Sequence, residues 1–377
     1  MFRALRPVGE AVTVEPSDRS IESVWPLGEQ WDRQFFVSGT AALAAACEMA
    51  VQDSAIDNPE IIIPAYTCPD VVSAVEKAGA IPVIVDLEIN SPQMSLKSVR
   101  ESVRHETVAI IPVNFLGIPE RIQDLRHIAE KRGIIVIYDH AQGFAKYSND
   151  VDIADAVVFS FGRGKPASAL VGGALLVNRK RLSLENVYGQ RSQTNRLHKT
   201  KVNLYNFFLR PNLYWVLPFF PMLKLGETRY RRLDTVEKLE DSSVGLIAAN
   251  IESYIANTCA VERRLHEAVK EFDMISLLHI VDRESNGRLL RYPVLFRSHA
   301  QREHALQIFQ KLSLGVTTMY PTVLNELPDL ANKVYAHRPV PNAQDFANRL
   351  VTLPCHSGVL ESDIANICKV LEEVLCV

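Results

Sequence analysis

Short apolar runs alternate with helical stretches over the first two thirds of the chain, and this alternation restricts the fold more than any other sequence feature. The apolar runs are rich in β-branched residues and are bounded by Pro, Gly, Asn or Asp, so each predicts a buried strand. They are Ile61–Ile63, Ile81–Val85, Val108–Val113, Ile134–Tyr138, Ala156–Phe161 and Ala174–Val177. Helical patterns separate them, at Thr40–Val51, Pro69–Lys77, Leu96–Arg104 and Arg121–Lys131. We therefore expect an α/β fold with a mixed, mostly parallel sheet flanked by helices.

The pattern changes from Val244 onward. A helical pattern runs from Val244 to about Lys270. The later elements are a strand at Arg288–Phe296, a helix at Gln301–Leu312, a strand at Arg349–Leu353 and a helix at Asp363–Leu375. A chain of 377 residues is long enough for two domains. We expect a large domain over residues 1–243 and a smaller C-terminal α+β domain over residues 244–377.

Composition argues against several classes of function. Lys and Arg number 41 and Asp and Glu 44, which gives a net charge of −3 and no basic surface for nucleic acid. The six cysteines form no C-x-x-C pair, and we expect no metal site. The N-terminus lacks the apolar core of a signal peptide, and no uncharged apolar run reaches the roughly 18 residues that span a bilayer. We expect a cytoplasmic protein.

The segment Leu204–Leu225 stands apart because it concentrates aromatic residues and prolines. Pro211, Pro218 and Pro221 prevent one continuous helix. The simpler interpretation is an arm buried beneath a neighbouring subunit or a lid. The alternative is a surface that contacts a membrane or a lipid-like substrate.

A first candidate site lies at residues 37–43, which read VSGTAAL. Small residues there open a strongly helical run. Gly39 would let the backbone approach a ligand closely, and Ser38 or Thr40 can cap the helix. The free N–H groups at a helix N-terminus bind anions, although an ordinary N-cap has the same sequence.

Two further segments place an ionisable residue after an apolar strand. Asp139 ends such a strand, at the sheet edge where ligands bind in α/β folds. A carboxylate there can hold a protonated ring nitrogen, or it can cap a turn. Lys165 follows Ser160 by five residues, in a glycine-rich loop. Its amine can form a Schiff base with a carbonyl, or it can be an ordinary solvent-exposed side chain.

Two nucleotide-binding motifs are excluded in this loop. Gly162-x-Gly164-x-x-Ala167 imitates a dinucleotide fingerprint, but Pro166 interrupts the helix that this motif must open. A P-loop requires Ser or Thr after Gly-Lys, and Pro166 stands in that place.

Together the three segments offer a helix N-terminus for a phosphate, Asp139 for a pyridine nitrogen, and Lys165 for an aldehyde. This is the minimal set of groups for pyridoxal 5′-phosphate, PLP. The adjacent His140 is one histidine beside one aspartate, which does not make a metal site.

The chain resembles the DegT/DnrJ/EryC1/StrS family of PLP-dependent aminotransferases, from about Phe36 to the C-terminus. The motifs that carry the resemblance are Ser38-Gly39-Thr40 with Ala42-Leu43, Pro64-Ala65-Tyr66-Thr67, Gly79-Ala80-x-Pro82 with Asp86, Gly117-x-Pro119, Asp139-x-Ala141-Gln142, Ser160-Phe161 with Lys165, Gly172-Gly173, and Leu353-Pro354-x-His356. The resemblance implies the PLP-dependent transferase fold of type I, the fold of aspartate aminotransferase.

The resemblance also assigns roles to individual residues. Lys165 matches the lysine that binds the cofactor aldehyde and moves the proton during transfer. Asp139 matches the acid that pairs with the pyridinium nitrogen. Gln142 matches an amide near the phenolic oxygen of the cofactor. Lys165 and Asp139 are therefore the expected catalytic residues.

A phosphate cup formed by Ser160 and by the segment Gly39–Thr40 follows from the same resemblance. The family commonly places an aromatic residue on the cofactor ring just after its P-x-x-T segment, and this chain has Cys68 there. Cys68 is therefore a cofactor-binding candidate, with Tyr66 or His140 as alternatives for stacking on the ring.

The implied reaction moves an amino group from an amino acid, by family habit glutamate, to a keto or aldehyde acceptor such as a nucleotide-linked keto sugar. A homodimer is implied as well. The family's Asn-Tyr-Arg segment is not recognisable in this chain, and the aromatic segment lies in its general region. Two alternatives stay open: another PLP reaction, such as elimination or decarboxylation, and a non-catalytic binding protein on the same fold.

Overall fold

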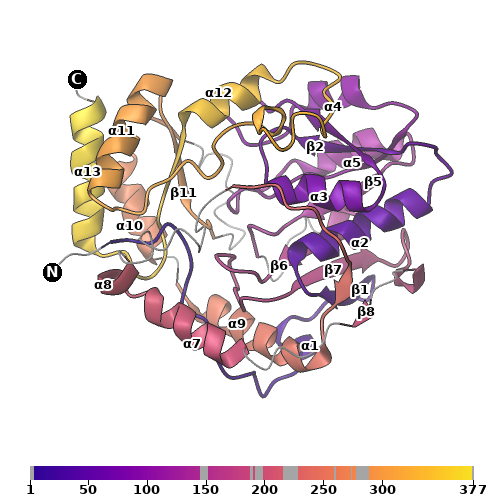
Figure 1. Cartoon of the computed structure of the whole chain (residues 1–377), viewed down its shortest axis with the longest axis horizontal. Helices are drawn as coiled ribbons and strands as arrows, with labels where there is room; N and C mark the ends of the chain where they lie inside the picture. The colour runs from indigo at the N-terminus through magenta and orange to yellow at the C-terminus, as the bar shows by residue number, and fades with distance from the viewer. Residues whose placement is uncertain are drawn as a thin grey trace.

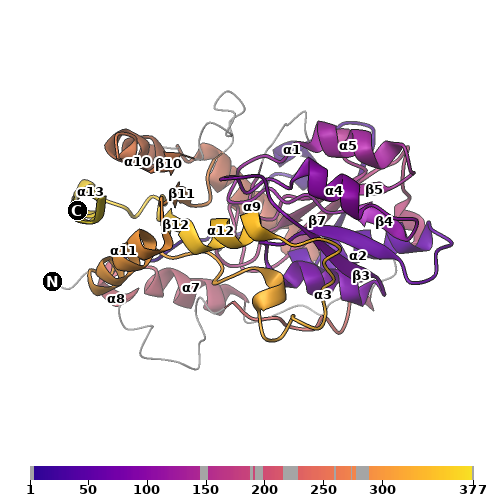
Figure 2. The same cartoon turned by 90° about the horizontal axis from the view of Figure 1, so that it is seen from above.

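The structure is a computed structural model that describes residues 4–144, 152–186, 190–191, 198–214, 228–258, 260–272, 274–276 and 288–375. Its elements form two groups around two sheets (Figure 1). The larger sheet and its helices occupy one side of the molecule. Helices α10, α11 and α13 lie with the smaller sheet on the other side, in both Figure 1 and Figure 2.

The larger sheet has the strand order β3-β2-β4-β5-β6-β7-β1-β9-β8 within the described residues. Its strands are β1 Trp31–Phe36, β2 Glu60–Pro64, β3 Ile81–Val85, β4 Thr107–Ile110, β5 Ile135–Asp139, β6 Ala156–Ser160, β7 Gly173–Asn178, β8 Gln190–Arg191 and β9 Glu237–Lys238. The run from β3 to β6 is parallel, whereas β7 is antiparallel to both β6 and β1. The expected mixed, mostly parallel sheet is therefore confirmed.

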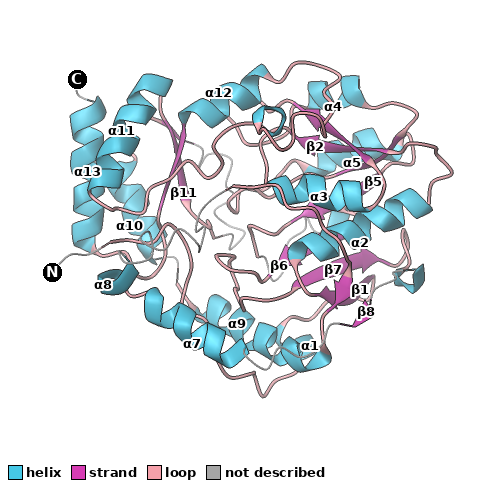
Figure 3. Cartoon of the chain, in the orientation of Figure 1, coloured by secondary structure: helices cyan, strands magenta, loops and turns pink. Residues whose placement is uncertain are grey.

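Helices cover both faces of this sheet (Figure 3). They are α1 Ile21–Val24, α2 Gly39–Gln52, α3 Pro69–Lys77, α4 Leu96–Ser102, α5 Ile122–Glu130 and α9 Val244–Ala256. On one face, the alanine-rich helix α2 packs closely against β6 and β7, because its small side chains let the helix approach the strands. On the other face, Trp25, Tyr138 and Ile247 belong to one buried cluster with α4 and α5.

The smaller sheet has the order β10-β11-β12, with β10 Ile275–Ser276, β11 Tyr292–Leu295 and β12 Leu350–Leu353. Its helices are α10 Ala260–Val269, α11 His299–Lys311, α12 Pro341–Arg349 and α13 Glu361–Leu375. The N-terminal segment runs along this part of the molecule, where the Leu5 amide donates to the Ser313 carbonyl at 2.9 Å. Helix α9 packs instead on the larger sheet through Ile247 and Ile251. The domain boundary at residues 243 and 244 stays a prediction.

The strands and helices predicted before residue 243 all form, with ends that shift by a few residues. One prediction after it was wrong: the pattern from Val244 to Lys270 is not a single helix. Helix α9 ends at Ala256, Asn257 has an extended backbone with ψ of 140°, and α10 begins at Ala260. The Arg288 guanidinium donates to the Asn257 carbonyl at 3.0 Å, which satisfies an acceptor that the broken helix leaves unpaired.

Two short helices, α7 His198–Phe208 and α8 Pro211–Tyr214, contain the described part of the aromatic segment. They lie along one edge of the molecule (Figure 1). The rest of that segment, residues 215–225, lies outside the described residues. Within the described ranges, no single helix is both long and apolar enough to cross a bilayer; only the bent pair Asp241–Ala256 and Ala260–Val269 would qualify together, by length and composition.

A buried carboxylate joins the two groups of elements. Asp86 follows β3 and is 7% exposed. Its oxygens accept the backbone amides of Asn342 at 3.2 Å and Ala343 at 2.8 Å, in the first turn of α12. Helix α12 has no capping side chain of its own at Val340. Asp86 therefore caps α12 from a distant point in the sequence, and α12 lies between the two groups in Figure 2.

We expect Asp86→Ala to lower the free energy of unfolding by about 2–3 kcal/mol, because it leaves two amides of α12, one buried and one partly buried, without acceptors. Chemical denaturation followed by circular dichroism measures the change. Asp57→Ala is the matched control, since Asp57 is exposed in a loop, and its effect should stay within about 0.5 kcal/mol. Equal losses in the two variants would contradict this role of Asp86.

Candidate active site

The candidate site lies where the central parallel strands end. Asp139 is the last residue of β5 and Ser160 the last residue of β6, and these two strands pair in parallel. Helix α2 begins at Gly39 beside them. The carboxyl ends of parallel strands share one edge of a sheet, so residues far apart in the sequence meet there. The structure brings together the three segments that the sequence singled out.

Asp139 is buried, with 7% of its surface exposed. Its Oδ1 accepts the Ala141 amide at 3.0 Å. Burial raises the pKa of Asp139, while the Ala141 hydrogen bond and the positive charge of Lys165 lower it. Among the described residues only Oδ1 receives a hydrogen bond from the protein, which leaves Oδ2 able to accept one from a ligand.

Lys165 lies in the loop after β6 and is partly buried. Its amide donates to the Gly162 carbonyl at 3.2 Å, and Gly164 has a positive φ of 72°. This turn brings Lys165 back toward the strand ends, where its charge lowers the pKa of both Asp139 and Cys68. Within the described part of the chain its amino group makes no hydrogen bond or ion pair. The amine therefore lies near the acid without being held by it.

The start of α2 forms the candidate phosphate cup. Ser38 caps the helix by accepting the Ala41 amide at 3.1 Å. Gly39 lies so close to Ser160 that an added Cβ would be 2.8 Å from the Ser160 hydroxyl. The Thr40 hydroxyl donates to the Asp70 carboxylate at 3.4 Å. The cup therefore contains the predicted residues together with an acid, Asp70, at its rim.

Gln142 is held at both ends of its amide. Its oxygen accepts the Leu116 amide at 3.0 Å, and its nitrogen donates to the Tyr320 hydroxyl at 2.9 Å. Leu116 is in the left-handed region with φ of 58°, in the turn that includes Gly117. Gln142 is thus fixed in orientation at the edge of the site, next to Asp139 in the sequence.

The structure separates the three residues that might cover a cofactor ring. His140 packs between Tyr138 and Phe159, on the opposite face of the sheet from α2, and burial lowers its pKa to about 4. Tyr66 donates to the Thr318 carbonyl at 2.7 Å and packs in an aromatic cluster with Phe115, Tyr320 and Phe346. Cys68 is the one of the three whose pKa responds to both Lys165 and Asp139.

Sequence reasoning missed two residues that the fold brings to this edge. Asp70 is in the first turn of α3, and its negative charge raises the pKa of Asp139 and of Cys68. Its position two residues after Cys68 could have suggested it. Tyr320 comes from a segment 178 residues after Gln142. No local pattern marks Tyr320, because only the fold brings it next to Gln142.

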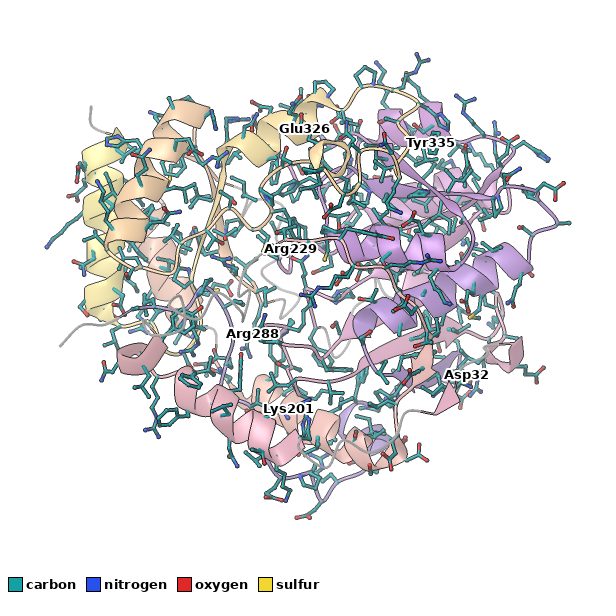
Figure 4. The ribbon with its side chains drawn as sticks, in the orientation of Figure 1. Asp32, Lys201, Arg229, Arg288, Glu326 and Tyr335 are labelled. Atoms are coloured by element: carbon teal, nitrogen blue, oxygen red, sulfur yellow. The ribbon has the colours of Figure 1, made fainter. Side chains whose placement is uncertain are left out.

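A cavity of about 260 Å³ opens beside Lys165. Its walls include Glu10, Tyr254, Arg288 and His356. Arg288, labelled near the middle of the molecule in Figure 4, lies over the Tyr254 ring at 3.9 Å. The carbonyl of Arg288 also approaches the turn that positions Gln142, since an added Cβ at Gly117 would lie 2.4 Å from it. The cavity therefore joins Lys165 to the C-terminal part of the chain.

Comparison with protein families identifies the family of this chain. The model of the DegT/DnrJ/EryC1/StrS aminotransferase family matches residues 35–202 and 242–372. The chain belongs to this family. It is therefore a PLP-dependent aminotransferase, as the resemblance implied, and PLP is its cofactor. The family match leaves out residues 203–241, the region that includes the aromatic segment.

Relatives and solved structures agree with this assignment. The GDP-perosamine synthase of Escherichia coli O157:H7 is 24% identical over 341 residues, which cover 89% of this chain and 84% of the relative. The pleiotropic regulatory protein of Geobacillus stearothermophilus is 24% identical over 324 residues, 82% of this chain and 77% of that protein. Helicobacter pylori PseC has the same fold, with a TM-score of 0.69 and 17% identity over 94% of this chain and 88% of PseC.

A second solved structure, the putative sugar aminotransferase Spr1654 of Streptococcus pneumoniae in its PMP form, gives a TM-score of 0.67 at 19% identity. The likeness covers 91% of this chain and 87% of that chain. These likenesses confirm the PLP-dependent transferase fold of type I.

The side chains at the strand ends fit this cofactor. An accessible carboxylate oxygen on Asp139 suits a protonated ring nitrogen, and the unpaired Lys165 amine suits an aldehyde. The close approach of Gly39 to Ser160 forms a narrow cradle at a helix N-terminus, where a phosphate binds favourably. One feature opposes phosphate binding: the negatively charged Asp70 carboxylate lies beside Thr40. The Thr40 hydroxyl can turn from Asp70 to a phosphate.

Cys68 should be an unreactive thiol. Burial and the charge of Asp70 raise its pKa to about 12, so the thiol stays protonated at pH 8. We expect iodoacetamide to alkylate Cys68 in the folded, cofactor-free protein at least about a hundredfold more slowly than in the urea-unfolded chain. Mass spectrometry of the peptide that contains Cys68 gives both rates. Similar rates in the two states would show that Cys68 is a reactive thiolate instead.

Proposed function

We propose that this aminotransferase moves an amino group from an amino acid, with glutamate as the expected donor, to the keto or aldehyde carbon of a sugar. Nucleotide-linked keto sugars are the acceptors that its relatives suggest, since one is named a GDP-perosamine synthase and a solved neighbour, DesI, was determined with its TDP-sugar product. The observation that carries the proposal is that Lys165 lies near the buried Asp139, beside the N-terminus of α2, with its amine free of any ion pair among the described residues.

When bound, PLP supplies an aldehyde that reacts with amines and a ring that withdraws electrons. Lys165 would bind the cofactor aldehyde, and its amine would move a proton at the substrate carbon. This role requires an amine that is not locked in an ion pair, and among the described residues Lys165 has none. Asp139 would keep the ring nitrogen protonated, because a buried carboxylate stabilises a neighbouring positive charge.

The surrounding residues position the cofactor. Ser160, Gly39 and Thr40 would hold its phosphate at the start of α2. Gln142 would direct its amide toward the phenolic oxygen, with Leu116 fixing its orientation. Cys68 would cover one face of the ring, a place that Tyr66 and His140 cannot take because they pack elsewhere.

The same proposal includes a homodimer and a cytoplasmic location, as the resemblance and the composition suggest. Light scattering on the purified protein tests the first, and a mass of about twice 42.2 kDa is expected. Cell fractionation tests the second. A monomeric active enzyme would contradict the proposed homodimer.

Lys165→Ala should abolish covalent capture of the cofactor. After borohydride reduction, we expect the wild-type protein and Lys180→Ala to carry the cofactor mass on the peptide that contains Lys165. Lys165→Ala should carry no cofactor on that peptide. Lys180 is an exposed lysine in the turn after β7 and serves as the control. Capture on another lysine in the wild-type protein would contradict the assignment.

Amino transfer itself should fall by at least about a thousandfold in Lys165→Ala, because the proton transfer loses its base. The readout is 2-oxoglutarate formed from glutamate in a single turnover of the loaded wild-type enzyme. If every donor tried releases ammonia or carbon dioxide without a keto acid, the reaction is elimination or decarboxylation instead. If no donor changes the bound cofactor at all, a non-catalytic role is favoured.

Asp139→Asn should slow the same single turnover by about a hundredfold, because a neutral amide does not hold the ring nitrogen protonated. The variant should still bind the cofactor, which absorbance of the dialysed protein measures. Asp57→Asn, on an exposed loop, should leave the rate unchanged. A normal rate in Asp139→Asn would show that the acid only caps the turn at Ala141.

A further inference from the structure

A second and larger cavity lies on the other side of the Lys165 loop. Its volume is about 850 Å³, within the range of pockets that hold ligands of drug size. Helices α7 and α8 form one wall, and the segment around Met319 forms another. The cavity reaches the catalytic loop through Arg163 and Gly164, which directly precede Lys165.

The charges in this cavity all have the same sign. Arg163, Lys201 and Arg291 line it, and no Asp or Glu is among its described lining residues. Arg163 and Lys201 are exposed, and Figure 4 labels Lys201 on α7. A pocket with three cations and no acid attracts anions and retains them.

Arg291 strengthens this attraction for anions because it is buried, with only 4% of its surface exposed. Its guanidinium donates to the Thr317 hydroxyl at 2.5 Å and to the Thr352 carbonyl at 2.9 Å, but its Nε has no partner among the described residues. No carboxylate pairs with it there. A buried charge without a counterion is costly, and a bound anion would offset part of that cost.

The remaining wall is largely apolar. Leu204 and Phe208 come from α7, Tyr214 from α8, and Leu209 from the connection between these helices. Leu204 is 56% exposed, so its side chain is available to a ligand in the cavity. These residues belong to the part of the chain, 203–241, that the family match leaves out.

The cavity also approaches the edge of the cofactor site. Thr318 and Met319 line it, and the next residue, Tyr320, accepts the hydrogen bond from Gln142. A ligand in the cavity would thus extend from the α7–α8 wall toward the loop of Lys165. This is the direction expected for the part of a substrate that does not react.

We propose that this cavity binds the carrier portion of the acceptor, and that the carrier is an apolar group joined to a phosphate. The phosphate would lie near Arg163 and Arg291, and the apolar group along Leu204, Phe208 and Tyr214. The inference rests on the proposed function, since it assigns the acceptor of that reaction. The carrier proposed here departs from the nucleotide carriers that the relatives suggest. A base needs polar partners along its edge, and the α7–α8 wall offers mainly aliphatic and aromatic carbon.

Isothermal titration calorimetry on the cofactor-loaded full chain tests the proposal. Three ligands are compared: inorganic phosphate, guanosine diphosphate, and dodecyl phosphate below its aggregation concentration. We expect dodecyl phosphate to bind at least about tenfold more tightly than either of the others, because only it contacts both the cations and the apolar wall. Tighter binding of guanosine diphosphate than of dodecyl phosphate would overturn the proposal in favour of a nucleotide carrier.

Two pairs of variants separate this site from non-specific binding. Leu204→Glu should weaken dodecyl phosphate by at least about tenfold, whereas Phe207→Glu should change it by less than about twofold. Phe207 is on the same helix and is 47% exposed, but it does not line the cavity. Arg163→Gln should weaken binding several-fold, and Arg210→Gln, outside the cavity, should not. Equal losses within either pair would overturn the assignment.

The proposal and the proposed function can fail separately. Keto-acid release from glutamate in the wild-type protein, together with dodecyl phosphate binding no tighter than phosphate, would refute the carrier site and leave aminotransfer intact. If dodecyl phosphate binds specifically but no amino group is transferred, the cavity binds a ligand that is not the acceptor of a reaction. That result would refute the acceptor assignment.

Discussion

The close approach of four small residues, Ser38, Gly39, Ser160 and Gly173, sets the position of the groups at the active edge. An added Cβ on Gly39 would lie 2.6 Å from the Ser160 Cβ, and one on Gly173 would lie 2.5 Å from the Ser38 carbonyl oxygen. Larger side chains would push the start of α2 away from the ends of β6 and β7. Because α2 begins in contact with these strands, its N-terminus, the end of β5 and the Lys165 loop surround one small volume.

The electrostatics of that volume follow from burial. Asp139 ends a strand inside the protein, where desolvation raises its pKa, and Lys165 is close enough to oppose this effect. Asp70 adds a second negative charge nearby. A buried acid that keeps one oxygen free is costly in isolation and useful only when a cationic partner completes it. A protonated pyridine nitrogen would be such a partner.

The chain combines a family frame with an added part. Residues that the family match includes supply the sheet, the phosphate cup and the lysine loop. Residues 203–214, outside the match, contribute an apolar wall to a cavity that reaches the same loop. In this arrangement the frame would determine the reaction, and residues 203–214 would contribute to the choice of acceptor. The division is physically reasonable, because loops on a rigid scaffold can change the pocket without moving the catalytic groups.

Local patterns in the sequence were sufficient for the strands and helices of the larger sheet and for the segments around Gly39, Asp139 and Lys165. They also led to the right family, because periodicity and strand-end chemistry depend on neighbours along the chain. They failed at Asn257, where a guanidinium from the distant Arg288 pairs with carbonyls at a break in a continuous apolar pattern. Strand β1 was missed because three consecutive polar residues, Asp32, Arg33 and Gln34, interrupt its apolar pattern.

Only the tertiary structure decided which residues share the site. It assigned His140 and Tyr66 to packing and left Cys68 near the ionisable pair. It brought Tyr320 to Gln142 across 178 residues, Asp86 to the start of α12, and Arg291 to the wall of the larger cavity. The sequence determined the elements and their chemistry because these depend on adjacent residues. Pairings between distant segments depend on how the sheet, α12 and α7 pack, and no local pattern contains that information.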